Sequence, residues 1–508
     1  MLCVSLMPET TELALRDLAE AARAADLAEL RLDAMREFDL ARLLAHPPCP
    51  IIVTYRPRRE GGRYDGPEAP RLETLRQAAR LGARYLDVEH DALTSLGDVA
   101  PAKVIVSYHN HERTPDDLPA IYARLAKTGA AVVKVAAQAN HILDTVPILR
   151  LLRDATRPTI ALSMGPRGVL TRILAPKFGA VLTYSAPSAG REAAPGQVAL
   201  TEMRDLYRVG RIGPRTRVYG VIADPVGHSL SPRLHNAAFA ELGLDAVYLP
   251  LWVEGDPAAF VRAMREFDFD GYSVTIPHKQ TVMKALDEIE PLARRIGAIN
   301  TLQRRPDGSL FGTNTDWTAG MASIEAVVGP GWLGGKRALL LGAGGVGRAM
   351  AFGLRQRGAE VTLADIDAAR TETLAREVGA STMDIRELQR GRAEKNERGG
   401  TEKNERDGSP DPPRANWDIL LNCTPIGMHP KTDASPAPKE MLRAGMVVYD
   451  AVYNPLETRL LAEARAAGCR TVAGIDHFVR QAVEQFELWT GRPAPVDTMR
   501  RVVVEALR

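Results

Sequence analysis

The feature that most constrains this fold is a series of short apolar segments that recurs about every 20 to 30 residues from the N-terminus. Eight segments fall within about 205 residues, and stretches of helical period, such as residues 11–25 and 119–126, lie between them. The segments begin at Leu2, Leu27, Ile51, Arg84, Lys103, Ala131, Thr159 and Ala180. Eight strand and helix units over this length favour a (β/α)8 barrel at residues 1–208 over an open sheet.

The same alternation restarts twice after the barrel. A Gly/Pro/Arg-rich stretch at residues 209–216 is typical of a linker, and new strand patterns begin at Arg217 and Lys336. We expect a small α/β domain at residues 217–329, completed by a helical tail at residues 476–508, and a Rossmann-type nucleotide lobe at residues 330–475. The chain is therefore predicted to be an α/β protein, a barrel followed by a two-lobed unit.

One segment is expected to lie outside any core. Within residues 391–414 the sequence EKNER occurs twice, surrounded by Gly, Asp, Ser and Pro. Polar low-complexity sequence buries too little apolar area to offset its ordering entropy, so we expect a disordered insertion in a surface loop.

The charge balance excludes several classes of protein. The 65 Lys and Arg residues against 63 Asp and Glu leave a formal charge of +2, and there is no basic block of the kind that binds nucleic acid or membrane surfaces. No stretch approaches 18 uninterrupted apolar residues. The four cysteines lie far apart and predict neither a disulfide framework nor a zinc cluster. We expect a cytoplasmic protein that acts on small molecules, as a monomer or a homodimer.

Polar residues gather where the barrel strands are expected to end, which is where barrel enzymes place their chemistry. Burial disfavours the charged form of a strand lysine, and a neutral amine can form an imine with a ketone. A neighbouring histidine can move protons, and a glutamate can orient its ring. A structural ion pair and a core histidine are the alternatives for single residues. The residues are Glu29, Arg31, Arg56, Glu60, His109 and Lys134. His109 and His111 have no third ligand nearby, so no metal site is predicted.

The segment GAGGVG at residues 342–347 satisfies GxGxxG, follows a strand pattern and opens a helix. Its glycines allow backbone N–H groups to approach a pyrophosphate at a helix N-terminus. Asp365 ends the next strand, where an acidic residue suits a ribose 2′-hydroxyl. The pattern predicts dinucleotide binding.

Further polar clusters precede this lobe in the segments GHSLSPRLHN, VTIPHK, GAINTL and GTNTDW. Lys279 and Asp316 form a plausible proton-transfer pair for oxidising an alcohol. Helix capping or a surface ion pair is the alternative for any one of these residues.

The first half resembles type I 3-dehydroquinate dehydratase through ELRLD at Glu29, TYRPRREGG at Thr54, SYHN at Ser107, VKVA at Val133, SMGPRGVLTR at Ser163 and APGQ at Ala194. The resemblance implies that Lys134 forms a Schiff base and that His109 shuttles protons with Glu60 as its partner. It also implies a set of substrate ligands: Glu29, Arg31, Arg56, Arg172 and Gln197. The usual serine before APGQ is Ala193, and the usual aspartate after the histidine is Asn110.

The second half resembles shikimate dehydrogenase, through the four segments above together with NCTPIGM, VYNPLET and Gln481. The resemblance implies proton transfer by Lys279 and Asp316. The implied substrate ligands are Ser229, Ser231, Thr275, Asn300, Tyr453 and Gln481. The implied cofactor-binding residues are Gly342, Gly344, Gly345, Val346, Gly347, Asp365, Arg370, Thr424 and Gly474.

Two departures concern the cofactor. Members that use NADP follow the second strand with arginines that clamp the 2′-phosphate, whereas this chain has Asp365 and Ile366 and keeps only Arg370, which predicts NAD over NADP. The methionine usual four residues before the glutamine is His477.

The whole chain thus resembles the fused 3-dehydroquinate dehydratase/shikimate dehydrogenase, which implies two consecutive reactions toward chorismate. Two alternatives remain: a catabolic NAD-linked quinate or shikimate dehydrogenase with a vestigial barrel, and a metabolite-sensing protein without catalysis. The second predicts losses among Lys134, His109, Lys279 and Asp316, yet all four are present.

Overall fold

The computed structural model describes residues 1–386, 388 and 417–508. The described chain divides into two compact units. The first contains residues 1–232 and 239–270, and the second contains residues 233–238 and 271–508. The insertion expected at residues 391–414 lies outside the described residues.

Eight parallel strands form a barrel in the first unit, as the spacing of the apolar segments predicted. They pair in the order β7-β6-β5-β4-β3-β2-β1-β8, and a bond of 3.0 Å from the Val181 N–H to the Thr159 carbonyl joins the two ends of this series. The strands are β1 (Leu2–Leu6), β2 (Leu27–Arg31), β3 (Ile51–Thr54), β4 (Tyr85–Glu89), β5 (Lys103–Asn110), β6 (Val132–Gln138), β7 (Thr159–Met164) and β8 (Thr183–Ser185).

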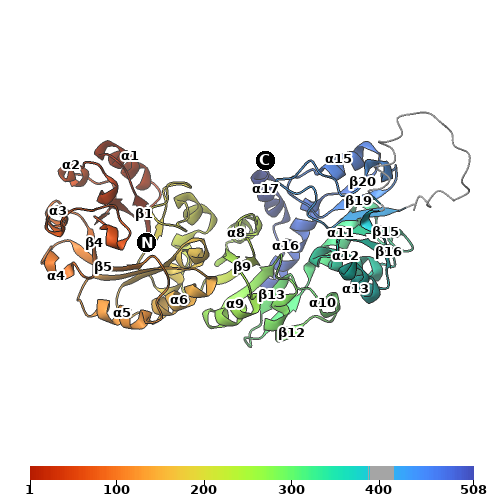
Figure 1. Cartoon of the computed structure of the whole chain (residues 1–508), viewed down its shortest axis with the longest axis horizontal. Coiled ribbons are helices and arrows are strands. Elements are labelled where there is room, and N and C mark those ends of the chain that lie inside the picture. The colour runs from red at the N-terminus through yellow and green to blue at the C-terminus, as the bar shows by residue number, and fades with distance from the viewer. Residues whose placement is uncertain (387, 389–416) are drawn as a thin grey trace, which may run out of the picture. The chain divides into compact units, whose positions relative to one another are not determined.

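Helices cover the outside of these strands (Figure 1). The strands are buried on both faces, which is why they read as continuous apolar runs rather than alternating ones. Thr10 caps the first helix by accepting a bond from the Leu13 N–H. The helices are α1 (Thr11–Ala21), α2 (Leu40–Leu44), α3 (Glu68–Arg80), α4 (Leu93–Leu96), α5 (Leu118–Ala126), α6 (Thr145–Asp154) and α7 (Val169–Ile173).

The first unit also contains two parallel strands and a helix that follow the barrel in sequence, namely β9 (Arg217–Ala223), β10 (Ala246–Trp252) and α9 (Pro257–Met264). Arg167 pairs with Glu254 and stacks over the Trp252 ring. Arg150 pairs with Glu266, and Phe178 meets Phe267 edge-on. The 209–216 segment lies against the barrel, because the Lys177 ammonium donates to the carbonyls of Pro214 and Thr216.

The second unit begins with a small mixed sheet. Strands β11 (Phe269–Val274), β13 (Thr301–Arg304) and β14 (Leu310–Thr313) are antiparallel, and β12 (Glu288–Ile289) runs parallel to β14. The two residues that begin β11 belong to the first unit. The helices of this part are α8 (Ser231–Glu241), which the unit boundary crosses, α10 (Pro291–Ile296) and α11 (Thr315–Val328).

The nucleotide lobe is a six-stranded parallel sheet in the order β17-β16-β15-β18-β19-β20. The order reverses between β15 and β18, and open α/β sheets bind ligands at such a switch point. The strands are β15 (Arg337–Leu341), β16 (Glu360–Ala364), β17 (Ser381–Thr382), β18 (Ile419–Asn422), β19 (Val447–Asp450) and β20 (Arg470–Val472). The helices are α12 (Gly345–Gln356), α13 (Ala368–Val378) and α15 (Arg459–Ala466).

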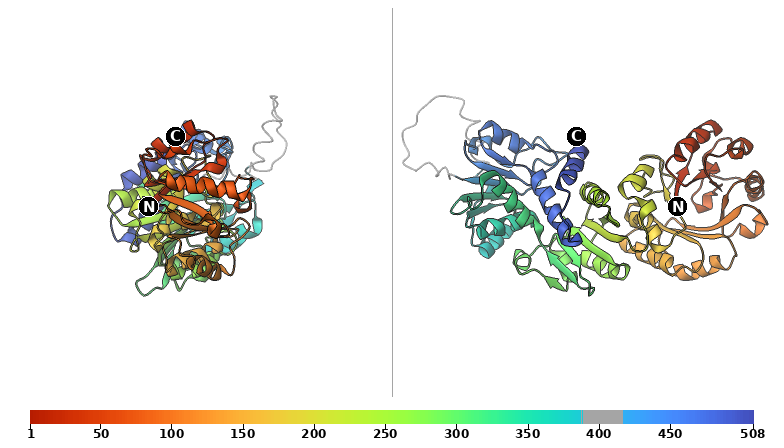
Figure 2. Two further views of the ribbon diagram at one scale, coloured as in Figure 1. Left: turned by 90° about the vertical axis from the view of Figure 1, so that its left-hand side faces the viewer. Right: turned by 180° about the vertical axis from the view of Figure 1, so that it is seen from behind.

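The C-terminal helices are α16 (Gly474–Thr490) and α17 (Val496–Ala506). Helix α16 packs along α11 and against β13 (Figure 2). The Trp489 indole N–H donates to the Leu302 carbonyl at 2.9 Å, and the Gln485 amide donates to the Thr301 hydroxyl at 3.0 Å. Among the described residues no helix is long and apolar enough to cross a membrane.

Candidate active sites

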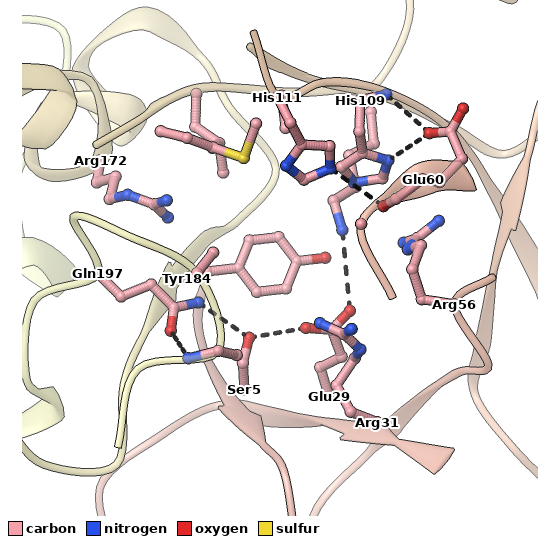
Figure 3. Close-up of a pocket in the computed structure, with 17 residues that line it drawn as sticks. Ser5, Glu29, Arg31, Arg56, Glu60, His109, His111, Arg172, Tyr184 and Gln197 are labelled. Carbon is pink, nitrogen blue, oxygen red and sulfur yellow. Dashed lines mark hydrogen bonds and ion pairs between the residues drawn. The ribbon is translucent and has the colours of Figure 1, made fainter. Parts of the chain in front are cut away.

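A pocket opens at the carboxyl ends of the barrel strands, where the sequence predicted the chemistry (Figure 3). All the barrel residues predicted from sequence line it, together with several that the sequence analysis did not select. The predicted ones are Glu29, Arg31, Arg56, Glu60, His109, Lys134, Arg172 and Gln197. The additional ones include Ser5, His111 and Tyr184.

Lys134 lies at the centre of the buried charges. Its side chain is 7% exposed, its ammonium lies 2.6 Å from the Asp87 Oδ2 and 3.8 Å from the Glu29 Oε1, and it faces the Tyr184 ring at 4.6 Å. Burial would raise the pKa of Asp87, but the charges of Arg56 and Lys134 outweigh it and hold that pKa well below its usual range. In the substrate-free pocket Lys134 is therefore ion-paired.

His109 is held as a neutral base. Burial, with the positive charges of Arg56 and Lys134, holds the pKa of His109 well below its ordinary value. Its Nδ1 lies 3.0 Å from the Glu60 Oε2, which also accepts the His109 backbone N–H at 3.1 Å. Burial raises the pKa of Glu60 to about 7 although Arg56 opposes the shift.

The three arginines of the pocket differ in what they are free to bind. Arg31 makes a two-bond contact with Asp33, and Arg56 is bound to Asp87 and Glu89. The Arg172 Nε and Nη2 are buried without a hydrogen-bond partner in the described part of the chain. Burial lowers the pKa of Arg172 to about 10, so the group is still charged at neutral pH and suits a carboxylate ligand.

The two departures in the barrel have distinct consequences. The Asn110 Oδ1 accepts the N–H groups of Glu112 and Arg113, which is a role that an aspartate would also fill. Ala193 offers only its backbone N–H, which donates to the Gln197 Oε1 at 2.8 Å. The loss of a side-chain hydroxyl at position 193 therefore removes one donor to a bound molecule.

Asp87 and Glu89, which bind the charged groups of the pocket from behind its lining, were also missed by sequence reasoning. They alternate along β4, so both point to the same side of that strand, and both are fully buried. The sequence pattern that could have identified them is a pair of acidic residues two positions apart in a buried barrel strand.

A second polar cluster forms where α11 begins in the second unit. The Lys279 ammonium lies 2.6 Å from the Asp316 Oδ2, and the Asn300 amide donates to the Asp316 Oδ1 at 2.8 Å. Burial would raise the pKa of Asp316, but the Lys279 charge and the His477 contact hold it well below its usual range. The structure thus brings the predicted proton-transfer pair together.

The other predicted substrate ligands of the second half lie on several different elements. The Gln481 carbonyl accepts the Thr315 hydroxyl at 3.1 Å, while its side chain donates to its own helix at Phe478. Tyr453 stacks on Phe478, and Thr275 lies in the loop after β11. Ser229 and Ser231 lie in the first unit at the start of α8, and their assignment rests on the sequence pattern.

The glycine loop between β15 and α12 fits a dinucleotide. Gly342 has φ of +103°, and a Cβ on Gly347 would lie 1.9 Å from the Gly342 carbonyl oxygen, so the turn requires both glycines. A Cβ on Gly344 would meet nothing within 4 Å, so the backbone is open at the N-terminus of α12. A Cβ on Gly345 would lie 3.1 Å from the Lys279 Cδ, which places the loop beside the proton-transfer pair.

The remaining predicted cofactor residues divide into two groups. Asp365 accepts the Ala343 N–H at 2.6 Å and the Asp367 N–H at 2.9 Å, so its carboxylate is fixed beside the glycine loop. Val346 and Thr424 also lie at this edge of the sheet. Arg370 pairs with Asp367, and a Cβ on Gly474 would lie 2.2 Å from the Val452 carbonyl oxygen, so Gly474 has a packing role.

Comparison with known proteins identifies the families of both halves of the chain. The family Type I 3-dehydroquinase matches residues 2–214, the shikimate dehydrogenase substrate binding domain matches residues 221–302, and the shikimate 5'-dehydrogenase C-terminal domain matches residues 474–504. The chain is 38% identical over 520 residues to a bifunctional 3-dehydroquinate dehydratase/shikimate dehydrogenase, chloroplastic, of Arabidopsis thaliana, covering 97% of this chain and 83% of that protein. The chain belongs to the bifunctional 3-dehydroquinate dehydratase/shikimate dehydrogenase family.

Relatives of the dehydrogenase half alone are also similar. A shikimate dehydrogenase (NADP(+)) of Methanosarcina acetivorans is 41% identical over 296 residues, 58% of this chain and 99% of that protein. A shikimate 5-dehydrogenase of Listeria monocytogenes, solved in complex with shikimate and NAD, has a TM-score of 0.50 at 31% identity and covers 58% of this chain and 98% of its own. The bifunctional enzyme therefore has a dehydratase, a lyase, in its barrel and a shikimate dehydrogenase, an oxidoreductase, in its second half, as the motifs predicted.

Proposed function

We propose that the dehydratase half works through an imine on Lys134. The Lys134 ammonium first gives up a proton, and the resulting amine adds to the ketone of 3-dehydroquinate. The same proton returns to the carbinolamine hydroxyl, which leaves as water and gives an iminium that acidifies the neighbouring C–H bond. Neutral His109 takes that proton and then returns it to the departing hydroxyl, which leaves as water. Hydrolysis of the imine frees 3-dehydroshikimate and restores the amine. The buried lysine beside a neutral histidine is the observation that carries this assignment.

The charges around Lys134 support this order of events. Asp87 stabilises the ammonium before substrate binds and the iminium afterwards, since both are cations at the same place. Arg172, whose buried guanidinium lacks two hydrogen bonds, is proposed to bind the substrate carboxylate, and Glu29 and Gln197 to bind its hydroxyls.

Borohydride reduction tests the imine directly. Treating the protein with 3-dehydroquinate and borohydride should add the mass of the reduced adduct to the peptide that contains Lys134. Lys134→Ala should lose both the adduct and the dehydratase activity, whereas Lys127→Ala, which removes an exposed lysine, should keep both. Normal dehydration by the Lys134 variant would overturn the assignment.

For the dehydrogenase half we propose that Lys279 and Asp316 transfer the proton. Lys279 donates a proton to the ketone oxygen of 3-dehydroshikimate as it becomes a hydroxyl, and Asp316 holds the ammonium in place. A nicotinamide cofactor at the glycine loop would supply the hydride. Asn300 is oriented by its bonds to Thr315 and Asp316 and is proposed to bind a substrate hydroxyl.

We further propose that NAD is preferred over NADP. The Asp365 carboxylate is fixed by two backbone N–H groups and retains lone pairs for the ribose hydroxyls. A 2′-phosphate would meet this carboxylate and Asp367 as like charges, while Arg370 is already paired with Asp367. The intact dehydratase pocket disfavours a catabolic enzyme with a vestigial barrel. We also propose that the protein is cytoplasmic.

A further inference from the structure

His477 has a place in the fold that the mechanism above does not use. It lies in the opening turn of α16 and is 6% exposed. The family resemblance places a methionine here, whereas an imidazole brings two ring nitrogens, each able to donate or accept a hydrogen bond. A buried imidazole needs partners for both nitrogens.

Both nitrogens face polar groups on neighbouring elements. The Nδ1 is hydrogen-bonded to the Tyr449 hydroxyl on β19. The Nε2 lies 3.7 Å from the Asp316 Oδ1 on α11. The Asp316 Oδ2 binds Lys279, so the imidazole faces the same carboxylate that holds the Lys279 ammonium.

The helix that contains Asp316 leaves room for the ring. Gly320 lies one helical turn after Asp316, and a Cβ there would be 3.4 Å from the His477 Nδ1 and 2.2 Å from the Met350 Sδ. A side chain at position 320 would therefore compete for the space in which Met350 and the imidazole lie.

The surroundings fix which nitrogen carries the proton. Burial raises the pKa of Tyr449 well above its ordinary value, so the hydroxyl keeps its proton and is able to donate it to the Nδ1. The Nε2 faces a carboxylate that can only accept, so the tautomer that satisfies both contacts carries its proton on the Nε2. The 3.7 Å separation is longer than a hydrogen bond, and contacts of this kind shorten when substrate fills a site.

We propose that His477 is a positioning residue of the dehydrogenase, which directs an N–H at Asp316, with its tautomer set by Tyr449, and thereby lowers the proton affinity of the Lys279–Asp316 pair. The proposal rests on the assignment of Lys279 and Asp316 to proton transfer. An additional donor withdraws charge from the carboxylate, so Lys279 releases its proton at a lower pH. Without that donor, shikimate oxidation needs a higher pH.

Other titratable groups face this cluster and define the controls. Lys279 and Asp316 lie on one side of the ring, and Tyr449 lies on the other with Cys423 and Asp450 near it. Further along α16, burial raises the pKa of Glu484 to about 7. Glu484→Gln therefore shows whether that carboxyl contributes to any change of the reaction rate with pH near neutrality.

The test is the pH profile of kcat/KM for shikimate oxidation in four variants. In His477→Met the ascending limb should move up by roughly 0.5 to 1 pH unit, which lowers the rate on that limb about 3- to 10-fold. His477→Gln keeps an N–H near the position of the Nε2 and should retain the native limb. Tyr449→Phe should give a smaller shift in the same direction. The double variant His477→Met, Glu484→Gln should show the same shift as His477→Met alone.

A binding measurement without cofactor gives a second readout. Shikimate titrations by calorimetry in two buffers of different ionisation enthalpy count the protons exchanged, and the pH midpoint of that exchange should move in His477→Met as the kinetic limb does. Melting temperatures check that each variant is folded.

Two results distinguish an error in the role of His477 from an error in the proton-transfer pair. If His477→Met slows the reaction without moving the limb, or if the Gln variant shifts as far as the Met variant, the imidazole only fills space and the proposal is wrong. If Lys279→Met oxidises shikimate with an unchanged limb, the proton-transfer pair itself is wrong and the proposal falls with it.

Discussion

The polar residues that line the barrel pocket could be selected from sequence because they lie within or shortly after apolar strands: Lys134 is inside β6, His109 is near the end of β5, and Glu60 is in the turn that follows β3. Their electrostatic states could not, because the partners come from other strands. Asp87 and Glu89 bind Arg56 across strand pairs, and the Glu60 pKa of about 7 results from burial that no sequence pattern encodes. His477 is a further case, since Tyr449 and Asp316 are 28 and 161 residues away in sequence.

We expect Glu60 to make the dehydratase activity depend on pH. A carboxyl group with a raised pKa is protonated below about pH 7, and its contact with His109 then loses the strength that the negative charge supplies. The dehydratase kcat/KM should therefore fall as the pH drops through about 7. Glu60→Gln should remove this limb and lower the plateau roughly 10-fold or more, whereas Glu112→Gln, an exposed neighbour, should match the native profile. An unchanged limb in Glu60→Gln would assign it to another group.

The proposed preference for NAD rests on Asp365. We expect kcat/KM to favour NAD by roughly 10-fold, since repulsion of a 2′-phosphate by partly exposed carboxylates is worth on the order of 1 to 2 kcal/mol. Ile366 is 89% exposed, so an arginine fits there without repacking. The double variant Asp365→Asn, Ile366→Arg should gain activity with NADP. A native preference for NADP, or a double variant that gains nothing, would contradict this prediction.

The strands of the barrel and of the nucleotide lobe were predictable because parallel strands with both faces covered form apolar runs that sequence periodicity detects. The extent of the last barrel strand was less predictable. Its apolar segment begins at Ala180, whereas β8 spans only Thr183–Ser185. Val181 forms its bond to Thr159 before the regular strand begins. The loops that shape the pockets were predictable only through recognised motifs, because their conformations depend on contacts between distant turns.

The loop at residues 193–197 allows a prediction at this scale. Gly196 has φ of +77°, and a Cβ on it would lie 2.2 Å from the Gly165 carbonyl oxygen, while the Gly165 N–H donates to Pro195 at 2.9 Å. Gly196→Ala should displace Gln197 and raise the dehydratase KM several-fold with little change in dehydrogenase activity. Gly190→Ala is the matched control, because its φ is +81° but no atom lies within 4 Å of the added Cβ. Equal effects from both would mean that backbone strain alone is responsible.

At the scale of the whole molecule, the described residues that line the barrel pocket all belong to the first half, and the proton-transfer pair lies in the second. Lys134→Ala should therefore abolish dehydration and leave shikimate oxidation within about 2-fold, and Lys279→Ala should do the reverse. Separate assays of the two reactions on folded variants measure this. Loss of both activities from either change would show that the two halves share a centre.

The contacts that Arg150, Arg167 and Phe178 make with the strands and turns after the barrel have a practical consequence for producing the dehydratase alone. A barrel cut after residue 214 would expose the Phe178 ring and leave both guanidinium groups without their carboxylates. Such a patch, apolar at its centre and cationic at its rim, promotes self-association. A soluble stand-alone barrel would need a polar residue at position 178 and neutral ones at positions 150 and 167, none of which lines its catalytic pocket.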